Sequence, residues 1–120
     1  MEIPLTIADH LRRAEVVYGD RIAIIDEPDQ VASPLPDLTY ARTGELSRAM
    51  AAGLDAMGLD MGARVAMVSH NAARMLVFLF GTSAFGRVGV PINFRLNVEE
   101  VQYIVDHSGA DGLLMDPELE

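Results

Sequence analysis

Three histidines are the side chains of this sequence best suited to acid–base chemistry, but their positions argue against a shared site. His10, His70 and His107 match no metal-binding spacing, and the chain has no cysteine to complete such a motif. His10 follows Asp9, and His107 follows Asp106. Neighbours in sequence on a helix point to different faces, so neither pair can act as a proton relay. We therefore interpret His10 and His107 as residues of helix surfaces or helix ends.

The segment Ser69-His70-Asn71 is the better candidate for contact with a ligand. It ends an apolar run, 64–69, that is typical of a buried parallel strand. Open α/β sheets bind their ligands at the carboxyl ends of such strands. The plainer interpretation is that Asn71 caps the following helix and His70 fills the turn before it. We favour the plainer interpretation and keep proximity to a substrate as the alternative for His70 and Asn71.

Acidic residues form one cluster that resembles a metal site. Asp26, Glu27 and Asp29 follow a predicted strand, as carboxylate ligands of Mg²⁺ do. Pro28 divides the cluster, and a loop rich in proline follows it. A solvated turn is therefore the favoured interpretation.

Glycines and hydroxyl residues suggest a phosphate-binding loop at 81–83, Gly81-Thr82-Ser83. Such a loop needs a strand before it, a helix after it and usually a lysine. Thr82 and Ser83 instead fall inside a predicted apolar helix, so we expect the glycines here and at 86–89 to allow close packing of helix against strand. Arg95 with Glu99 or Glu100 is expected to be, at most, an ordinary ion pair at the start of a helix.

Composition narrows the chemistry further. The chain has 120 residues and a formal net charge of −9, and its nine basic residues are all arginine, with no lysine, cysteine or tryptophan. It therefore has no thiol nucleophile, no disulfide and no lysine to form a Schiff base or bind a nucleotide phosphate. The negative charge argues against nucleic acid and anionic membranes as partners.

Segments for export or membrane insertion are not predicted. The longest uncharged run, 75–86, is far shorter than the roughly 20 residues that span a bilayer. Residues 1–4 lack the basic start and apolar stretch of a signal peptide. We therefore expect a cytoplasmic protein without a transmembrane segment.

Apolar periodicity and capping residues predict alternating helices and strands. The first helix is expected to be capped by Thr6 with Asp9 and to bury Ile7, Leu11, Ala14 and Tyr18. The last helix is expected to be capped by Asn97, to turn Val98 inward and to end at Gly109. The expected helices are 6–18, 43–57, 72–85 and 98–106, and the expected strands are 21–26, 38–40, 64–69, 88–92 and 112–115.

This order defines the fold class as α/β. From residue 43 onward the pattern is αβαβαβ, preceded by a helix and a β-hairpin with a long loop. Continuous apolar strands alternating with helices predict a parallel sheet between helical layers. A three-stranded parallel sheet leaves its edges unpaired and its helices partly uncovered, so the chain is expected to be an incomplete piece of a larger domain.

The blocks of sequence, taken together, resemble the amino-terminal part of the acyl-CoA synthetases, in the superfamily of acyl-adenylate-forming ligases. Each block is weak alone, but their order and spacing agree with that family over nearly all of residues 1–120. At two positions the chain differs from the usual family residues, with Arg74 where an acidic residue is common and Arg42-Thr43 where Glu-Leu is common. The blocks are TIADHL (6–11), YGDRIAI (18–24), LTY (38–40), LDAMG (54–58), GARVAM (62–67), GRVGVPINFRL (86–96), EEVQYI (99–104) and DHSGA (106–110).

The resemblance implies a two-step reaction for an intact enzyme. A carboxylic acid, of the fatty-acid or a related class, attacks the α-phosphate of ATP, and the thiol of CoA then displaces AMP, with Mg²⁺ assisting the phosphoryl chemistry. In the family a phosphate loop, an adenine-binding aromatic segment, a ribose-binding aspartate and a catalytic lysine perform these steps. All of them belong downstream of residue 120, so no catalytic, cofactor-binding or metal-binding residue is assigned here, and the chain alone is expected to be inactive.

Two other functions are kept as alternatives. One is a free-standing α/β binding or signalling module, similar to a receiver domain, that would use Asp26 and Glu27. The other is a truncated, non-catalytic relative of the ligases that pairs with another chain. If the chain folds in isolation, we expect it to self-associate through its exposed sheet edge or its apolar helices.

Overall fold

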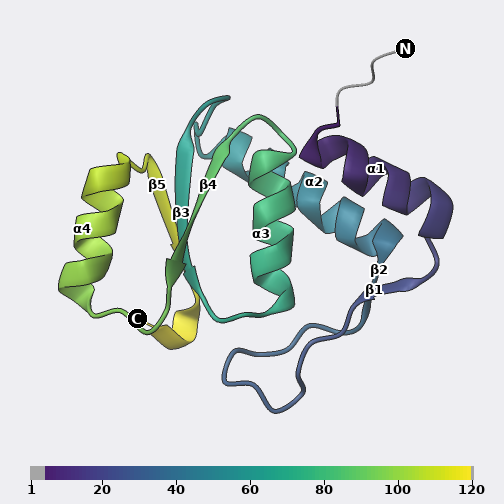
Figure 1. Ribbon diagram of the computed structural model, residues 1–120, viewed down its shortest axis with the longest axis horizontal. Helices are drawn as coiled ribbons and strands as arrows, with labels where there is room; N and C mark the ends of the chain where they lie inside the picture. The colour runs from purple at the N-terminus through teal and green to yellow at the C-terminus, as the bar shows by residue number, and fades with distance from the viewer. Residues whose placement is uncertain (1–4, 120) are drawn as a thin grey trace.

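The computed structural model describes residues 5–119, so the signal-peptide argument at residues 1–4 and the end of the chain at Glu120 lie outside the described residues. The element order agrees with the expected one, from an N-terminal helix and hairpin to the αβαβαβ unit (Figure 1). The elements are α1 (Ile7–Tyr18), β1 (Ile22–Ile24), β2 (Leu38–Thr39), α2 (Tyr40–Ala56), β3 (Arg64–Ser69), α3 (Ala73–Ser83), β4 (Val88–Asn93), α4 (Val98–Ser108), β5 (Gly112–Met115) and a 3₁₀ turn, η1 (Pro117–Leu119).

The parallel sheet has the order β4-β3-β5, with β3 at its centre. All five residues from Val65 to Ser69 are buried, which explains why this strand is apolar without interruption. In register, Ser69 lies beside Asn93 of β4, and Val68 lies beside Met115 of β5. The carboxyl ends of the three strands therefore meet at one edge of the sheet.

Helices cover both faces of the sheet, as Figure 1 shows with α3 on one side and α4 on the other. Val65 and Met67 of β3 pack with Leu54 of α2 and Phe78 of α3. Alternate residues of β3 point to the opposite face, where Ala66 and Val68 form a second cluster. That cluster is completed by Ile92 and by the α4 residues Val101, Ile104 and Val105.

The ends of the first and last helices follow the sequence prediction. At α1, the Asp9 amide donates to Thr6 Oγ1 and the Asp9 carboxylate accepts from the Thr6 amide, which completes a capping box. The hydrogen bonds from the Thr6 backbone and hydroxyl hold the pKa of Asp9 below its usual value. Asn97 and Glu100 form the same arrangement at α4, and Gly109 ends that helix in the left-handed conformation.

The second helix begins three residues earlier than predicted. Tyr40 was expected in the hairpin strand and Thr43 at the start of the helix, but α2 starts at Tyr40. Thr39 is the reason, because its hydroxyl accepts a hydrogen bond from the Arg42 amide at 3.1 Å and caps the helix. The hairpin itself is confirmed, since β1 and β2 pair in antiparallel fashion across a long loop.

Three apolar residues that were expected to face inward are exposed. Ile7 and Tyr18 of α1 are 47% and 43% exposed, and Val98 of α4 is 84% exposed. In α1 only Leu11 is fully buried, although this helix contacts both α2 and α3. The predicted periodicity was correct, but the described chain does not cover the whole apolar stripe.

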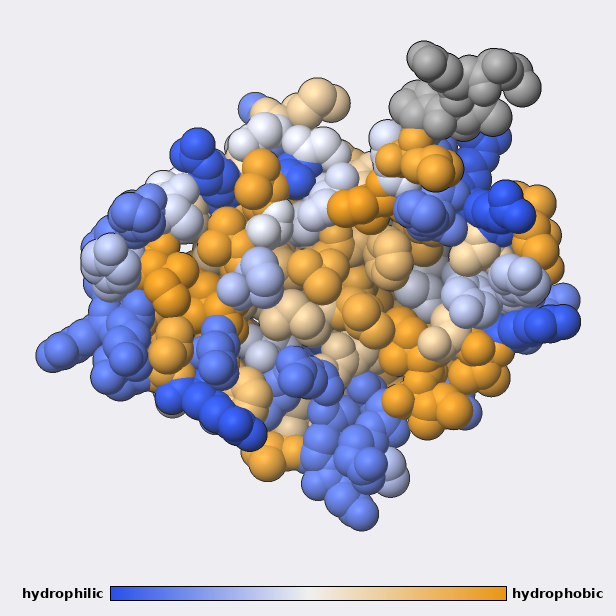
Figure 2. Space-filling view, viewed as in Figure 1, coloured by the Kyte–Doolittle hydropathy of each residue, from blue (hydrophilic) through white to orange (hydrophobic). Residues whose placement is uncertain are grey.

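The chain exposes more surface than a compact protein of its size. Its accessible surface is 7718 Å², whereas a compact monomer of 13.0 kDa exposes about 6300 Å². The radius of gyration is 15.0 Å, against about 14 Å expected for this length. Figure 2 shows apolar residues reaching the surface in several patches on one face. The fold class is confirmed, including its incompleteness. Within residues 5–119, no helix combines the length and the apolar character needed to cross a membrane.

Candidate functional site

A hollow of about 360 Å³ opens between the carboxyl ends of β3 and β4, and we call it the crevice. Its lining combines apolar side chains with a hydroxyl, two amides and one guanidinium. The Arg95 guanidinium carbon lies 5.5 Å from the centroid of the Phe94 ring, so the cation packs on an aromatic face instead of pairing with Glu99 or Glu100. The residues that line the crevice are Ser69, Asn71, Met75, Leu79, Pro91, Ile92, Asn93, Phe94 and Arg95.

The topology of the sheet explains where the crevice forms. The connection after β3 leads to α3 on one face, and the connection after β4 leads to α4 on the other face (Figure 1). Adjacent strands whose connections leave in opposite directions make a switch point, and ligands of open α/β sheets bind there. Asn71 lines this crevice, whereas His70 lies behind the Phe94 ring.

Asn71 does not cap the helix that follows it, which corrects the sequence prediction. The N-cap residue of α3 is Ala72, whose side chain makes no capping hydrogen bond. Asp26 replaces it from a distance of 47 residues in sequence, because its Oδ1 accepts a hydrogen bond from the Ala73 amide at 2.7 Å. A carboxylate at a helix N-terminus satisfies a free amide and complements the helix dipole.

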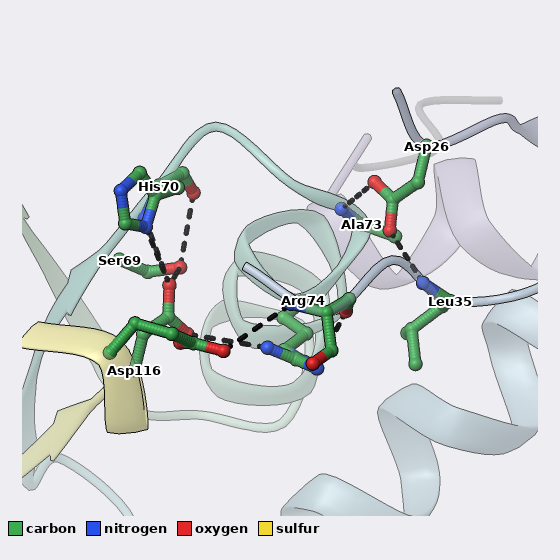
Figure 3. Close-up of polar contacts among 9 residues, drawn as sticks. Asp26, Leu35, Ser69, His70, Ala73, Arg74 and Asp116 are labelled. Carbon is green, nitrogen blue, oxygen red and sulfur yellow. Dashed lines mark hydrogen bonds and ion pairs between the residues drawn. The ribbon is translucent and has the colours of Figure 1, made fainter. Parts of the chain in front are cut away.

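Asp26 is therefore not part of a solvated turn, as the sequence had suggested. Its second oxygen accepts from the Leu35 amide at 2.9 Å, so the carboxylate also holds the hairpin loop (Figure 3). Glu27 and Asp29 are exposed, as expected. In the described part of the chain, no three His, Cys, Asp or Glu side chains lie close enough to hold a metal ion.

A buried carboxylate, Asp116, organises the end of β3. Its Oδ2 accepts hydrogen bonds from the Ser69 hydroxyl at 2.7 Å and the His70 amide at 3.0 Å (Figure 3). The His70 Nδ1 atom lies 3.5 Å from the same oxygen. The Arg74 Nη1 atom approaches the other oxygen at 3.9 Å. Asp116 thus joins β3, α3 and the segment after β5.

The hydrogen bonds of Asp116 decide its ionisation. Burial acts to raise the pKa of this carboxyl group. The bonds from the Ser69 hydroxyl and the His70 amide, with smaller contributions from the His70 imidazole and Arg74, outweigh burial, and the pKa of Asp116 lies below its usual value. The group is consequently an anion at neutral pH.

Arg74 also holds the hairpin loop. Its Nη2 donates to the Ser33 carbonyl at 2.7 Å. The position that carries an acidic residue in many acyl-CoA synthetases is therefore used here to connect the loop to Asp116. A reversed charge at residue 74 is consistent with an acidic partner at residue 116.

Sequence reasoning missed Asp116, although a signal was present. Asp116 directly follows β5, as His70 directly follows β3, and residues that follow parallel strands meet at one edge of the sheet. The prediction would have required the pairing of β5 with β3, which periodicity alone does not give. Phe94 was missed in the same way, since it directly follows β4.

The remaining candidates lie away from the crevice and have structural roles. His107 stacks on Tyr103 at the surface of α4, with ring centroids 5.5 Å apart, and His10 is exposed on α1. Thr82 is fully buried and donates to the Phe78 carbonyl at 2.7 Å within α3. The expected helix–strand packing is found at Gly89 of β4, where an added Cβ would lie 2.9 Å from Thr82 Oγ1 of α3. Gly81 instead packs against a helix, because an added Cβ there would lie 2.5 Å from Met50 Cγ of α2.

Comparison with known proteins identifies the family. The family model described as "AMP-binding enzyme" matches residues 7–120. A long-chain-fatty-acid–CoA ligase from Thermus thermophilus is 32% identical over 124 residues, covering 99% of this chain and 21% of the relative. A feruloyl-CoA synthase from an Amycolatopsis species is 41% identical over 81 residues, covering 68% of this chain and 16% of the relative.

Solved structures agree in fold. A fatty acyl CoA synthetase from Mycobacterium tuberculosis superposes with a TM-score of 0.82 at 30% identity, over 95% of this chain and 22% of that chain. The N-terminal subdomain of Klebsiella oxytoca NpsA superposes with a TM-score of 0.80 at 23% identity, over 93% of this chain and 28% of that chain, which shows the fold alone. The chain thus spans about a fifth of the length of the curated relatives it matches. It belongs to the family of AMP-binding enzymes that includes the acyl-CoA ligases, and it corresponds to only a part of such an enzyme.

Proposed function

We propose that the chain is the amino-terminal portion of an AMP-forming acyl-CoA synthetase acting on a fatty acid or a related carboxylic acid. The match of the family model to residues 7–120 carries this proposal. The relatives named for long-chain fatty acids and for feruloyl groups support an organic carboxylate as the substrate. In the intact enzyme, the carboxylate oxygen would bond to the α-phosphorus of ATP as pyrophosphate leaves. The CoA sulfur would then bond to the acyl carbon as AMP leaves.

The residues of this chain do not fit the groups that bind the triphosphate. Gly81-Thr82-Ser83 lies inside α3, with Thr82 bonded to its own helix, and the sequence has no lysine. Within residues 5–119 no cluster of acidic residues suits Mg²⁺ either. ATP, CoA and Mg²⁺ would be bound by the remainder of an intact enzyme, and this portion would serve mainly as its scaffold.

His70 and Asn71 remain the candidates for proximity to a substrate. Asn71 lines the crevice directly, and its side chain is free of the capping role that the sequence had suggested. His70 would act indirectly, by contacting Phe94, which lines the crevice. In an intact enzyme, Asn71→Ala would raise KM for the ligand seated in the crevice, with Asp29→Ala, an exposed loop change, as the matched control.

The signalling-module alternative is not favoured by the geometry of Asp26. Both oxygens of this carboxylate accept backbone hydrogen bonds, from Ala73 and Leu35, so Asp26 is not presented as a phosphate acceptor. A truncated partner protein remains an alternative, because the exposed surface exceeds that of a compact monomer of this size.

ATP–pyrophosphate exchange provides the decisive test. We expect the purified 120-residue chain to give no carboxylate-dependent exchange, since it has no triphosphate-binding lysine. The matched positive sample is a version extended by the downstream reading frame, where roughly 450 further residues would be expected, because 124 aligned residues make up 21% of the Thermus thermophilus relative. Exchange by the chain alone would contradict its predicted inactivity, and a stop codon after residue 120 would favour the truncated relative.

Cytoplasmic location stays a prediction, which microscopy of a tagged chain would test.

A further inference from the structure

The His70 side chain lies between a buried carboxylate and an aromatic ring of the crevice. Its Nδ1 atom is 3.5 Å from Asp116 Oδ2 and is buried without a hydrogen-bond partner among the described residues. The centroid of the Phe94 ring is 4.3 Å from that of the imidazole, with the rings inclined at 35°. His70 therefore contacts both the polar network behind the sheet edge and the wall of the crevice.

A change of charge on His70 would act on both contacts. Histidine ordinarily gains or loses its proton between about pH 5 and pH 8. A charged Nδ1–H donor prefers a carboxylate oxygen at about 2.7–2.9 Å, which is shorter than the observed separation of 3.5 Å. The imidazole would have to move to reach that distance, and Phe94 rests on the imidazole.

Three charged groups face this arrangement. Asp116, whose carboxylate is ionised at neutral pH, lies 3.5 Å from His70 Nδ1. Arg74 on α3 lies 3.9 Å from the other oxygen of Asp116 and partly offsets its charge. Arg95, which follows β4, packs on Phe94 and opposes a second cation on the same ring. The Asp116 carboxylate directly contacts the imidazole, so its attraction for a charged imidazole favours movement toward Asp116 on protonation.

We propose that His70 is a proton-responsive positioning residue, whose protonation draws the imidazole toward Asp116 and shifts the Phe94 wall of the crevice. Any effect of this movement on substrate binding rests on the proposed function, whereas the movement itself does not. It would make the shape of the crevice depend on the protonation of His70. Met75 is a suitable reporter, because it lines the crevice from α3 and is not a neighbour of His70 in the network.

Nuclear magnetic resonance of the 120-residue chain, measured from about pH 5 to pH 8, tests the proposal. We expect the Phe94 ring signals and the Met75 methyl signal to shift together with the His70 imidazole signal, at one common midpoint. His70→Phe retains an aromatic ring but cannot ionise, so it should lose the pH-dependent shifts of Phe94 and Met75. His70→Gln provides a second non-ionising variant in case the larger ring disturbs folding.

His107 offers the matched control, because it stacks on Tyr103 on the exposed surface of α4. His107→Phe should leave the shifts of Phe94 and Met75 intact. A Met75 signal that stays constant while His70 titrates, or shifts that persist in both His70 variants, would overturn the proposal. Pyrophosphate exchange is a separate readout, so an inactive extended enzyme with intact shifts would count against the proposed function and not against this movement.

Discussion

Single carboxylates connect distant segments of this chain. Asp116 accepts hydrogen bonds from Ser69 and His70, 47 and 46 residues earlier in the sequence. Asp26 accepts from Ala73, 47 residues later, and from Leu35. Each carboxylate satisfies backbone amides that a helix start or a loop would otherwise leave unpaired. Polar groups at the sheet edge are therefore fixed by residues that lie outside their own elements.

The stabilisation from Asp116 should depend on pH in a defined direction. Its pKa in the folded chain lies below the value of about 3.9 for an unfolded aspartate. The contribution is then present above the unfolded pKa and is lost as pH falls through the folded pKa. Asp116→Asn should lower the free energy of unfolding by about 1–3 kcal/mol at neutral pH, and the difference should shrink below about pH 4.

Urea unfolding of both proteins from neutral pH down to about pH 3 would measure this difference. Asp29→Asn, at an exposed position of the hairpin loop, is the matched control and should have little effect. A difference for Asp116→Asn that is independent of pH would contradict the assigned role.

Helix ends and helix contacts determine the arrangement of elements around the crevice. The amino end of α3 depends on Asp26, and the contact between α2 and α3 depends on a glycine. An added Cβ at Gly81 would lie 2.5 Å from Met50 Cγ and 3.0 Å from the Ser47 carbonyl oxygen. At Gly53, on the outside of α2, an added Cβ would meet nothing within 4 Å. Gly81 is therefore needed for the close contact between α2 and α3, whereas no packing contact requires a glycine at Gly53.

Substitution of these glycines by alanine should have opposite effects. Gly53→Ala should raise the free energy of unfolding by about 0.5–1 kcal/mol, because alanine has the higher helix propensity. Gly81→Ala should lower it by about 1–3 kcal/mol, because the close contact with α2 cannot be kept. Chemical denaturation would compare the two variants, and stabilisation by both would show that α2 and α3 are not in close contact.

The cap of α3 can be tested in the same way. Asp26→Ala should cost about 1–2 kcal/mol, since it removes the acceptor of the Ala73 amide. Asn71→Ala should change stability by less than about 0.5 kcal/mol, because Asn71 makes no capping bond. Thermal unfolding of both variants would rank them, and a larger loss for Asn71→Ala would restore the cap predicted from sequence.

At the scale of the whole molecule, the sheet is not closed. Both β4 and β5 are edge strands, and Leu113 and Met115 of β5 are 45% and 43% exposed. Unpaired edges with apolar side chains favour association with another strand. The accessible surface of the chain is larger than that of a compact monomer of this size. The difference is similar to the surface area buried in a small protein interface.

Self-association of the chain is accordingly expected, and light scattering would measure it. The net charge of −9 opposes association, so higher salt should increase the mean mass by screening the repulsion. Leu113→Lys places a charge on the edge strand and should reduce association. Val31→Lys, at an exposed loop position, adds the same charge and is the matched control. It should reduce association less than Leu113→Lys does. A monodisperse monomer at all salt concentrations would refute this prediction.

The sequence by itself determined the order and type of the elements. Strand 64–69 and the capping boxes at Thr6 and Asn97 were predicted correctly, because they depend on residues within a few positions of one another. Local patterns also predicted the parallel sheet and the incomplete fold. They did not predict the start of α2 correctly, because Thr39 could be assigned equally to a strand or to a cap.

Only the tertiary structure decided which polar side chains meet. The pairing of β5 with β3 brings Asp116 to His70, and the return of the hairpin loop brings Asp26 to α3. Contacts between residues more than 40 positions apart depend on strand order, and helical or strand periodicity carries no information about that order. Local sequence patterns therefore pointed to His70 and Asn71, whereas the folding of the sheet brought Asp116 and Phe94 beside them.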